Sequence, residues 1–82
     1  MSGVVTVRYF AGAAEAAGRE EELIEASDLG SLRDAITRRH GDALARVLGR
    51  CSLLVDGRRA DAPGTPLPAG ATIDVLPPFA GG

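Results

Sequence analysis

Hydrophobic and polar residues alternate near both ends of the chain, and this alternation predicts β-strands. In the segment Val4–Phe10, one face carries Val5, Val7 and Tyr9, while polar residues separate them. The segment Thr72–Leu76 alternates in the same way. Because these two segments are the most hydrophobic strands, we expect them at the centre of a sheet.

Between these segments, a helical spacing of apolar residues predicts one main helix. Ser31 is expected to cap it, with Asp34 as the capping-box partner and Gly41 as its end. Before the main helix we expect a short helix over Ala11–Ala17 that ends at Gly18, and a weak strand over Arg19–Ala26. After it we expect a helical piece capped by Asp42, and strands over Cys51–Val55 and Arg58–Ala60 joined by a turn at Asp56-Gly57. A turn-rich stretch follows over Pro63–Gly70, in which Leu67 fills the core.

This order of elements predicts an α+β fold with one main helix packed on one face of a small mixed sheet. Such packing buries the apolar stripe of the helix and the apolar face of the sheet together. The arrangement is that of a β-grasp, or ubiquitin-like, fold. We expect the folded domain to span residues 1–76 and an extended tail to span residues 77–82.

Composition and charge narrow the classes of function. The 82 residues suffice for one small domain. Nine basic residues, all of them arginine, oppose eleven acidic ones, so the net charge of −2 argues against a nucleic-acid partner. No apolar run is long enough to cross a membrane, and Cys51 is the single cysteine. A cytoplasmic protein without disulfides is therefore expected.

The remaining polar residues predict neither a catalytic constellation nor a metal site, and no bound cofactor is expected. His40 is expected near the free carbonyls at the helix end, and Cys51 as a small buried hydrophobe. The acidic run Glu20, Glu21 and Glu22 is expected at a solvated strand edge. The pairs Arg38-Arg39 and Arg58-Arg59 are only weak candidates for partner contacts. The chain is thus not expected to be an enzyme on its own.

The last six residues, Pro77-Pro78-Phe79-Ala80-Gly81-Gly82, carry the clearest chemical signal. The two prolines favour an extended approach, and a thread of two glycines passes through a channel that any side chain would obstruct. Upstream, Phe10, Leu76, Pro77, Pro78 and Phe79 are candidates for an exposed apolar docking patch. Ala80 and Gly81 would then pass through the partner's channel, and Gly82 would present its carboxylate.

Two segments resemble the small subunit of molybdopterin synthase, a MoaD-type protein of the MoaD/ThiS ubiquitin-like sulfur carrier family. They are Asp74–Gly82 at the end of the chain and Val5–Ala11 at its start, the latter followed by an alanine-rich turn and Gly18. The likeness covers the whole chain in length and element order, and it is most specific in the tail. The paired prolines are more similar to MoaD than to the thiamine and cysteine sulfur carriers.

This resemblance implies that an activating enzyme (a MoeB-like adenylyltransferase) uses ATP to adenylate Gly82. A sulfur donor, supplied by a sulfurtransferase, would displace AMP and leave a thiocarboxylate. The resemblance further implies a MoaE-like large subunit, with which the chain would form a heterotetramer and deliver sulfur to the pterin precursor. The alternatives are a sulfur carrier for cysteine or thiamine synthesis, a ubiquitin-like protein modifier, and an interaction module whose Gly-Gly is accidental.

Overall fold

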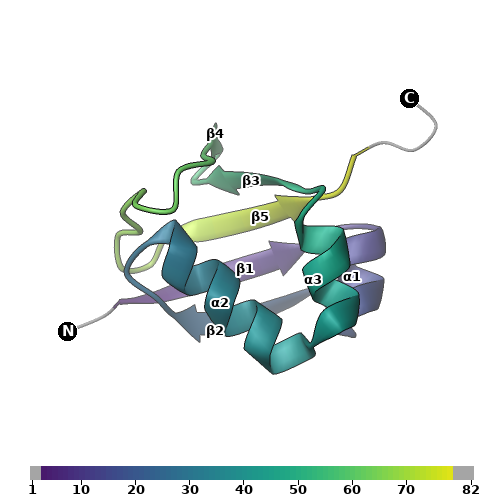
Figure 1. Cartoon of the computed structure of the whole chain (residues 1–82). Coiled ribbons are helices and arrows are strands. Elements are labelled where there is room, and N and C mark those ends of the chain that lie inside the picture. The colour runs from purple at the N-terminus through teal and green to yellow at the C-terminus, as the bar shows by residue number, and fades with distance from the viewer. Residues whose placement is uncertain (1–2, 79–82) are drawn as a thin grey trace.

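A computed structural model describes residues 3–78, which form a five-stranded sheet with helices on one of its faces (Figure 1). The elements in chain order are β1 (Val4–Tyr9), α1 (Gly12–Ala17), β2 (Glu21–Glu25), α2 (Leu29–His40), α3 (Asp42–Leu48), β3 (Ser52–Val55), β4 (Arg58–Arg59) and β5 (Thr72–Leu76). The mixed sheet, with one long helix packed on it, confirms the predicted α+β class and β-grasp fold.

The strand order is β2-β1-β5-β3-β4, so the first and last strands lie inside the sheet, as predicted. β1 and β5 are parallel, whereas the pairs β1–β2, β3–β5 and β3–β4 are antiparallel. A parallel pair needs a long crossover, and α2 and α3 lie within this connection. The ends of β1 and β5 therefore point the same way, toward the point where the chain continues into its C-terminal residues (Figure 1).

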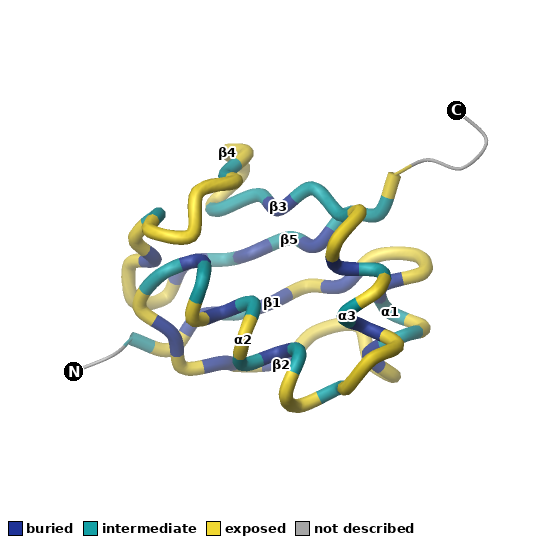
Figure 2. The backbone as a smooth tube through the Cα atoms, viewed as in Figure 1, coloured by how far each residue is buried: buried dark blue, intermediate teal, exposed yellow. Residues whose placement is uncertain are grey.

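The core lies between the sheet and the helices (Figure 2). Val5, Val7 and Tyr9 are buried there, as their alternation predicts. The helices contribute fully buried apolar side chains to the same core, namely Leu29, Leu32, Ile36 and Leu44. Leu67, from the turn-rich connection, is also buried, as expected. The opposite face of the sheet, called the open face below, carries the alternate residues of β1 and β5.

The predicted cap of the main helix is wrong. Asp28, not Ser31, is the N-cap, and its side chain accepts a 2.7 Å hydrogen bond from the backbone N–H of Ser31. This bond lowers the pKa of Asp28. Asp34 therefore has no capping role. The helix begins at Leu29, three residues before the predicted start, and so includes Gly30. A Cβ at Gly30 would lie only 3.2 Å from the side chain of Pro63, so glycine permits this close approach.

Other boundaries differ from the predictions by one or two residues. Phe10 and Cys51 lie just outside their strands, and Asp42 is in the first turn of α3 instead of capping it. The cap at Gly18 is confirmed, since this residue adopts the left-handed conformation at φ 74°. None of the helices found between residues 3 and 78 has the length and apolar character needed to span a bilayer.

Candidate functional site

The parallel pairing of β1 and β5 brings Phe10 beside the start of the tail. Tyr9 is opposite Val75, and the backbone N–H of Phe10 donates a 3.2 Å hydrogen bond to the Val75 carbonyl. Phe10 and Leu76 continue the alternation that leaves Arg8 and Asp74 on the open face. The side chain of Phe10 is exposed, Leu76 and Pro77 are half-buried, and Pro78 is exposed. Of the predicted docking residues, Phe10 thus lies beside the end of β5, and Pro77 and Pro78 continue the chain from Leu76.

An ion pair supports Phe10 from the neighbouring positions. The guanidinium of Arg8 donates hydrogen bonds of 2.6 and 3.0 Å to the two carboxylate oxygens of Asp74. This bidentate pair raises the pKa of Arg8, mainly through the hydrogen bond and the charge of Asp74. The same guanidinium lies 5.7 Å from the centre of the Phe10 ring, within cation–π range. The Phe10 ring therefore lies against an ion pair that links the two central strands, β1 and β5.

The backbone turns sharply after Phe10. Ala11 has φ 49° and ψ −125°, a conformation that strongly favours glycine. The carbonyl of Phe10 accepts a 3.0 Å hydrogen bond from Ala13, which starts α1 directly behind the patch. Such backbone strain typically costs about 1–3 kcal/mol and persists where the surroundings impose it. Phe10 is consequently held at a constrained turn and not in a free loop.

Four of the predicted site residues lie outside the described residues: Phe79, Ala80, Gly81 and Gly82. Their roles as docking residue, channel thread and reactive terminus stay predictions. The structure bears on their surroundings, because β5 ends at Leu76 beside Phe10. A segment that continues from Pro78 begins at the edge of the patch.

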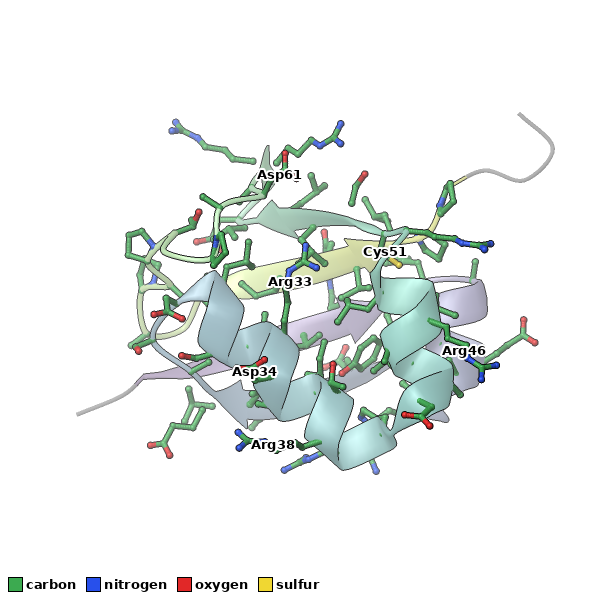
Figure 3. All side chains as sticks on the ribbon, in the orientation of Figure 1. Arg33, Asp34, Arg38, Arg46, Cys51 and Asp61 are labelled. Atoms are coloured by element: carbon green, nitrogen blue, oxygen red, sulfur yellow. The ribbon has the colours of Figure 1, made fainter. Side chains whose placement is uncertain are left out.

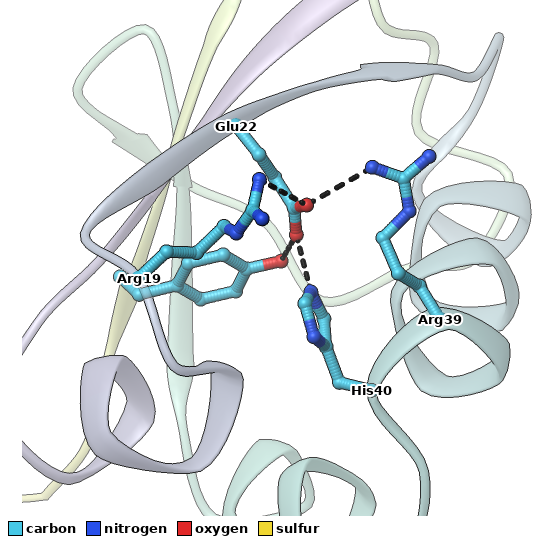
Figure 4. A network of polar contacts seen from close by, with 5 residues as sticks. Arg19, Glu22, Arg39 and His40 are labelled. Atoms are coloured by element: carbon cyan, nitrogen blue, oxygen red, sulfur yellow. Dashed lines mark hydrogen bonds and ion pairs between the residues drawn. The ribbon is translucent and has the colours of Figure 1, made fainter.

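A polar cluster, formed by Tyr9, Arg19, Glu22, Arg39 and His40, lies at the other side of β1 (Figure 4). The carboxylate of Glu22 accepts hydrogen bonds from the Tyr9 hydroxyl at 2.5 Å and from Arg39 at 3.1 Å. Oε2, which accepts the bond from Tyr9, is also 2.5 Å from Nε2 of His40. Oε1, which accepts the bond from Arg39, is 3.6 Å from the guanidinium of Arg19. The cluster ties the edge strand β2 to the C-terminal end of α2.

The prediction that the whole acidic run stays in solvent is wrong for Glu22, whose side chain is only 1% exposed. Burial by itself would raise the pKa of Glu22, but the hydrogen bonds from Tyr9, His40 and Arg39 outweigh it and lower the pKa. Burial and the bond to Glu22 raise the pKa of Tyr9. Alternation along the strand could have indicated this burial, because Glu22 shares a strand face with Ile24 and Ala26, which are buried in the core.

His40 and Cys51 are the only histidine and the only cysteine of the chain, and both make contacts that stabilise the fold. His40 packs edge-on against the Tyr9 ring, with centroids 5.8 Å apart, and contacts Glu22 where free helix carbonyls were expected. Cys51 donates its S–H to the Val47 carbonyl, and burial raises the pKa of its thiol (Figure 3). A raised pKa makes the thiolate scarcer, which disfavours nucleophilic chemistry at this position.

Comparisons with known proteins agree with this geometry. The profile of the ThiS family matches residues 7–82. Small archaeal modifier protein 1 from Haloferax volcanii is 30% identical, with a TM-score of 0.84 over 98% of this chain and 100% of that chain. A search of the curated proteins returned no significant match.

Two complexes contain similar chains. One is the complex of subunits 1 and 2 of the molybdopterin-converting factor from Helicobacter pylori, in which a chain is 33% identical, with a TM-score of 0.76 over 96% of this chain and 99% of that chain. The other is the BexX/CysO complex of Amycolatopsis orientalis, in which a chain is 19% identical, with a TM-score of 0.77 over 95% of this chain and 99% of that chain. At that identity the second likeness concerns the fold alone.

Proposed function

Because this chain belongs to the ThiS family and has the fold of its ubiquitin-like sulfur carriers, we propose that it carries sulfur for molybdopterin synthesis. The observation that supports this pathway is the 33% identity to a chain of the Helicobacter pylori molybdopterin-converting factor. In this role the protein is the small, non-catalytic subunit of a synthase, and it binds no cofactor itself. A large subunit would hold the pterin precursor and supply the catalytic groups.

The chemistry takes place at Gly82. Its carboxylate attacks the α-phosphorus of ATP on an activating enzyme, which releases pyrophosphate and forms a mixed anhydride with AMP. Sulfide, released from the persulfide of a sulfurtransferase by a thiol reductant, then adds to the carbonyl carbon, and AMP leaves. The resulting thiocarboxylate is a better nucleophile than the carboxylate, so its sulfur attacks a carbon of the pterin precursor and displaces an oxygen substituent, which forms a thioester. Hydrolysis of the thioester link then returns Gly82 to the carboxylate.

The folded domain contributes recognition and reach. Phe10, Leu76, Pro77 and Pro78 surround the start of the tail, and Phe79 would add to the docking surface. Both partners, the activating enzyme and the large subunit, must accept the same tail, so a shared docking patch at its start serves both. Ala80 and Gly81 would occupy the channel, where a bulky side chain would block entry.

The test is the intact mass of the protein after incubation with ATP, a candidate activating enzyme and a sulfur source. We expect the mass to rise by the exchange of one oxygen for sulfur. Gly82→Ala should slow this exchange by at least about tenfold, because the added methyl group would fit poorly in a narrow channel. A rise of about 1.4 kcal/mol in the activation free energy lowers the rate tenfold. Deleting Gly81 and Gly82 should abolish it while thermal unfolding is unchanged. Sulfur transfer to Gly82→Ala at the normal rate would contradict the proposal.

A protein modifier is the second candidate, favoured by the 30% identity to a chain whose name identifies it as a small archaeal modifier. In that role a lysine amine of a target protein would attack the adenylated Gly82, in place of sulfur. Covalent adducts that form in cell extracts with wild-type protein, but not with the variant that lacks Gly81 and Gly82, would support this second function. A carrier for cysteine or thiamine synthesis would instead accept sulfur and fail to donate it to a pterin precursor.

A further inference from the structure

Two exposed arginines lie beside the start of the tail, on the helix side of the sheet. Arg46 is in α3, and Arg50 is in the turn that follows it. Together with Val47, Pro77 and Pro78 they line a groove of about 410 Å³. Arg46 points outward from α3 at the end of the molecule where the chain leaves β5 (Figure 3). We call this surface the arginine groove.

The charges of the arginine groove are not neutralised by the described part of the chain. Between residues 3 and 78, neither Arg46 nor Arg50 lies within ion-pair distance of a carboxylate. Four other arginines do, namely Arg8, Arg19, Arg39 and Arg59. The chain as a whole has a net charge of −2, so the groove is a locally positive site on an acidic protein. Unpaired guanidinium groups retain their capacity for bidentate bonds to carboxylates.

We propose that the arginine groove binds an acidic segment on the rim of the channel through which the activating enzyme takes up the tail. This inference rests on the proposed function, because that function requires a partner to act on Gly82. The four residues that follow Pro78 span at most about 14 Å when fully extended. An enzyme that reacts with Gly82 must therefore bring its surface close to Pro78, which is one of the residues that line the groove.

The composition of the groove defines the occupant. Asp or Glu side chains of the partner would accept hydrogen bonds from Arg46 and Arg50, and an apolar side chain beside them would pack on Val47 and Pro78. A basic partner surface would be repelled. The groove and Phe10 lie on opposite sides of β5, since α3 covers the core face and Phe10 follows the open face. The partner would thus hold the start of the tail from both sides.

The test reverses the charge of the groove and compares it with a matched pair elsewhere. Arg46→Glu/Arg50→Glu is compared with Arg58→Glu/Arg59→Glu, an exposed pair on β4 that carries the same change in charge. Pyrophosphate release is measured at varied carrier concentration, with the activating enzyme that supports sulfur loading. We expect the groove variant to raise the KM for the carrier at least about tenfold, with kcat unchanged, because mismatched charges weaken association. The β4 variant should keep the wild-type KM.

A second signature separates binding from misfolding. The wild-type KM should rise with salt, whereas that of Arg46→Gln/Arg50→Gln, which keeps the size of the side chains better, should rise less. Equal KM values for wild type and both charge-reversed variants would overturn this inference and leave the proposed function in place. A lower KM for the groove variant would also overturn it, since the arginines would then be retaining the chain's own carboxylate. Wild-type protein that no activating enzyme adenylates would overturn both.

Discussion

The carboxylate of Glu22 is buried and accepts hydrogen bonds from Tyr9 and Arg39, with His40 at the same distance as the Tyr9 hydroxyl. Tyr9 comes from β1, and Arg39 and His40 come from the last turn of α2, so the cluster acts as a cross-link between β1, β2 and the end of α2. A buried carboxylate is costly unless its partners are all in place. The cluster therefore makes the position of β2 depend on side chains that are distant in sequence.

Glu22→Gln is expected to lower the free energy of unfolding by about 1–3 kcal/mol at neutral pH, because a charge-assisted network is broken in a buried site. The pKa of Glu22 is lowered in the fold, so its contribution is present above the ordinary value of 4.5 and is lost as the pH falls below it. The difference from wild type should shrink in this acid range. Urea unfolding at a series of pH values measures it, with Glu21→Gln, an exposed neighbour, as the control. Equal losses in both variants would contradict the role of Glu22.

Tyr9 offers an independent optical test of the same cluster, since it is the only tyrosine and the chain has no tryptophan. Its raised pKa means that the phenol should stay protonated in the folded protein at about pH 10, where free tyrosine is half ionised. The unfolded chain ionises there, so stability should fall as the pH rises above this value. Absorbance of the phenolate, followed together with circular dichroism, should show ionisation only upon unfolding. Ionisation at pH 10 with the fold intact would contradict the buried hydrogen bond.

At the scale of elements, α2 illustrates how a cap is chosen. Asp28 and Ser31 are both favoured N-cap residues, and either one is compatible with the apolar spacing that follows. The choice of Asp28 places Leu29 in the core and lets Gly30 contact the Pro63 loop, where its N–H donates a 2.8 Å hydrogen bond to the Pro63 carbonyl. Tertiary contacts thus extend the helix by one turn.

Asp28→Ala is expected to lower the free energy of unfolding by about 1 kcal/mol, because the Ser31 N–H loses its acceptor. Ser31→Ala should change it by less than about 0.5 kcal/mol, since the main bond to Asp28 comes from the backbone N–H of Ser31. Thermal unfolding of the two variants compares the alternative caps directly. The reverse order of the two effects would favour the cap expected from the sequence.

On the scale of the whole molecule, the helices cover one face of the sheet and leave the other open. The two surfaces proposed for partner contacts, the patch around Phe10 and the arginine groove, meet where β5 ends at Leu76. This position follows from topology, because parallel pairing of the first and last strands sends both C-terminal ends to the same edge. Any partner that takes the tail therefore encounters both surfaces.

Phe10→Ala is expected to raise the KM of the activating enzyme for the carrier by at least about fivefold, because truncated aromatic anchors typically cost more than 1 kcal/mol. The free energy of unfolding should change little, as the ring is exposed. Leu23→Ala is the matched control, since Leu23 is an apolar residue of β2 that is 65% exposed. An equal effect of both variants on KM would contradict a specific role for Phe10.

Local patterns in the sequence were sufficient to predict the main helices and strands, though not all of their ends, together with the class of fold and the chemistry expected of the tail. Alternation placed Val5, Val7 and Tyr9 in the core, and Gly18 ended a helix, because both signals depend only on backbone geometry and near neighbours. The proposal for Gly82 likewise depends on the sequence of the tail and on family resemblance.

The tertiary structure alone determined what depends on pairing between distant segments. The burial of Glu22 required a phenol from β1 and basic groups from the end of α2, and no local pattern records that these meet. The cap at Asp28 was selected by the Pro63 loop, and the arginine groove exists only because α3 ends beside Pro77 and Pro78. Side chains that are far apart in sequence acquire their pKa values and charge environment from contacts that the fold creates, so these features could be found only in three dimensions.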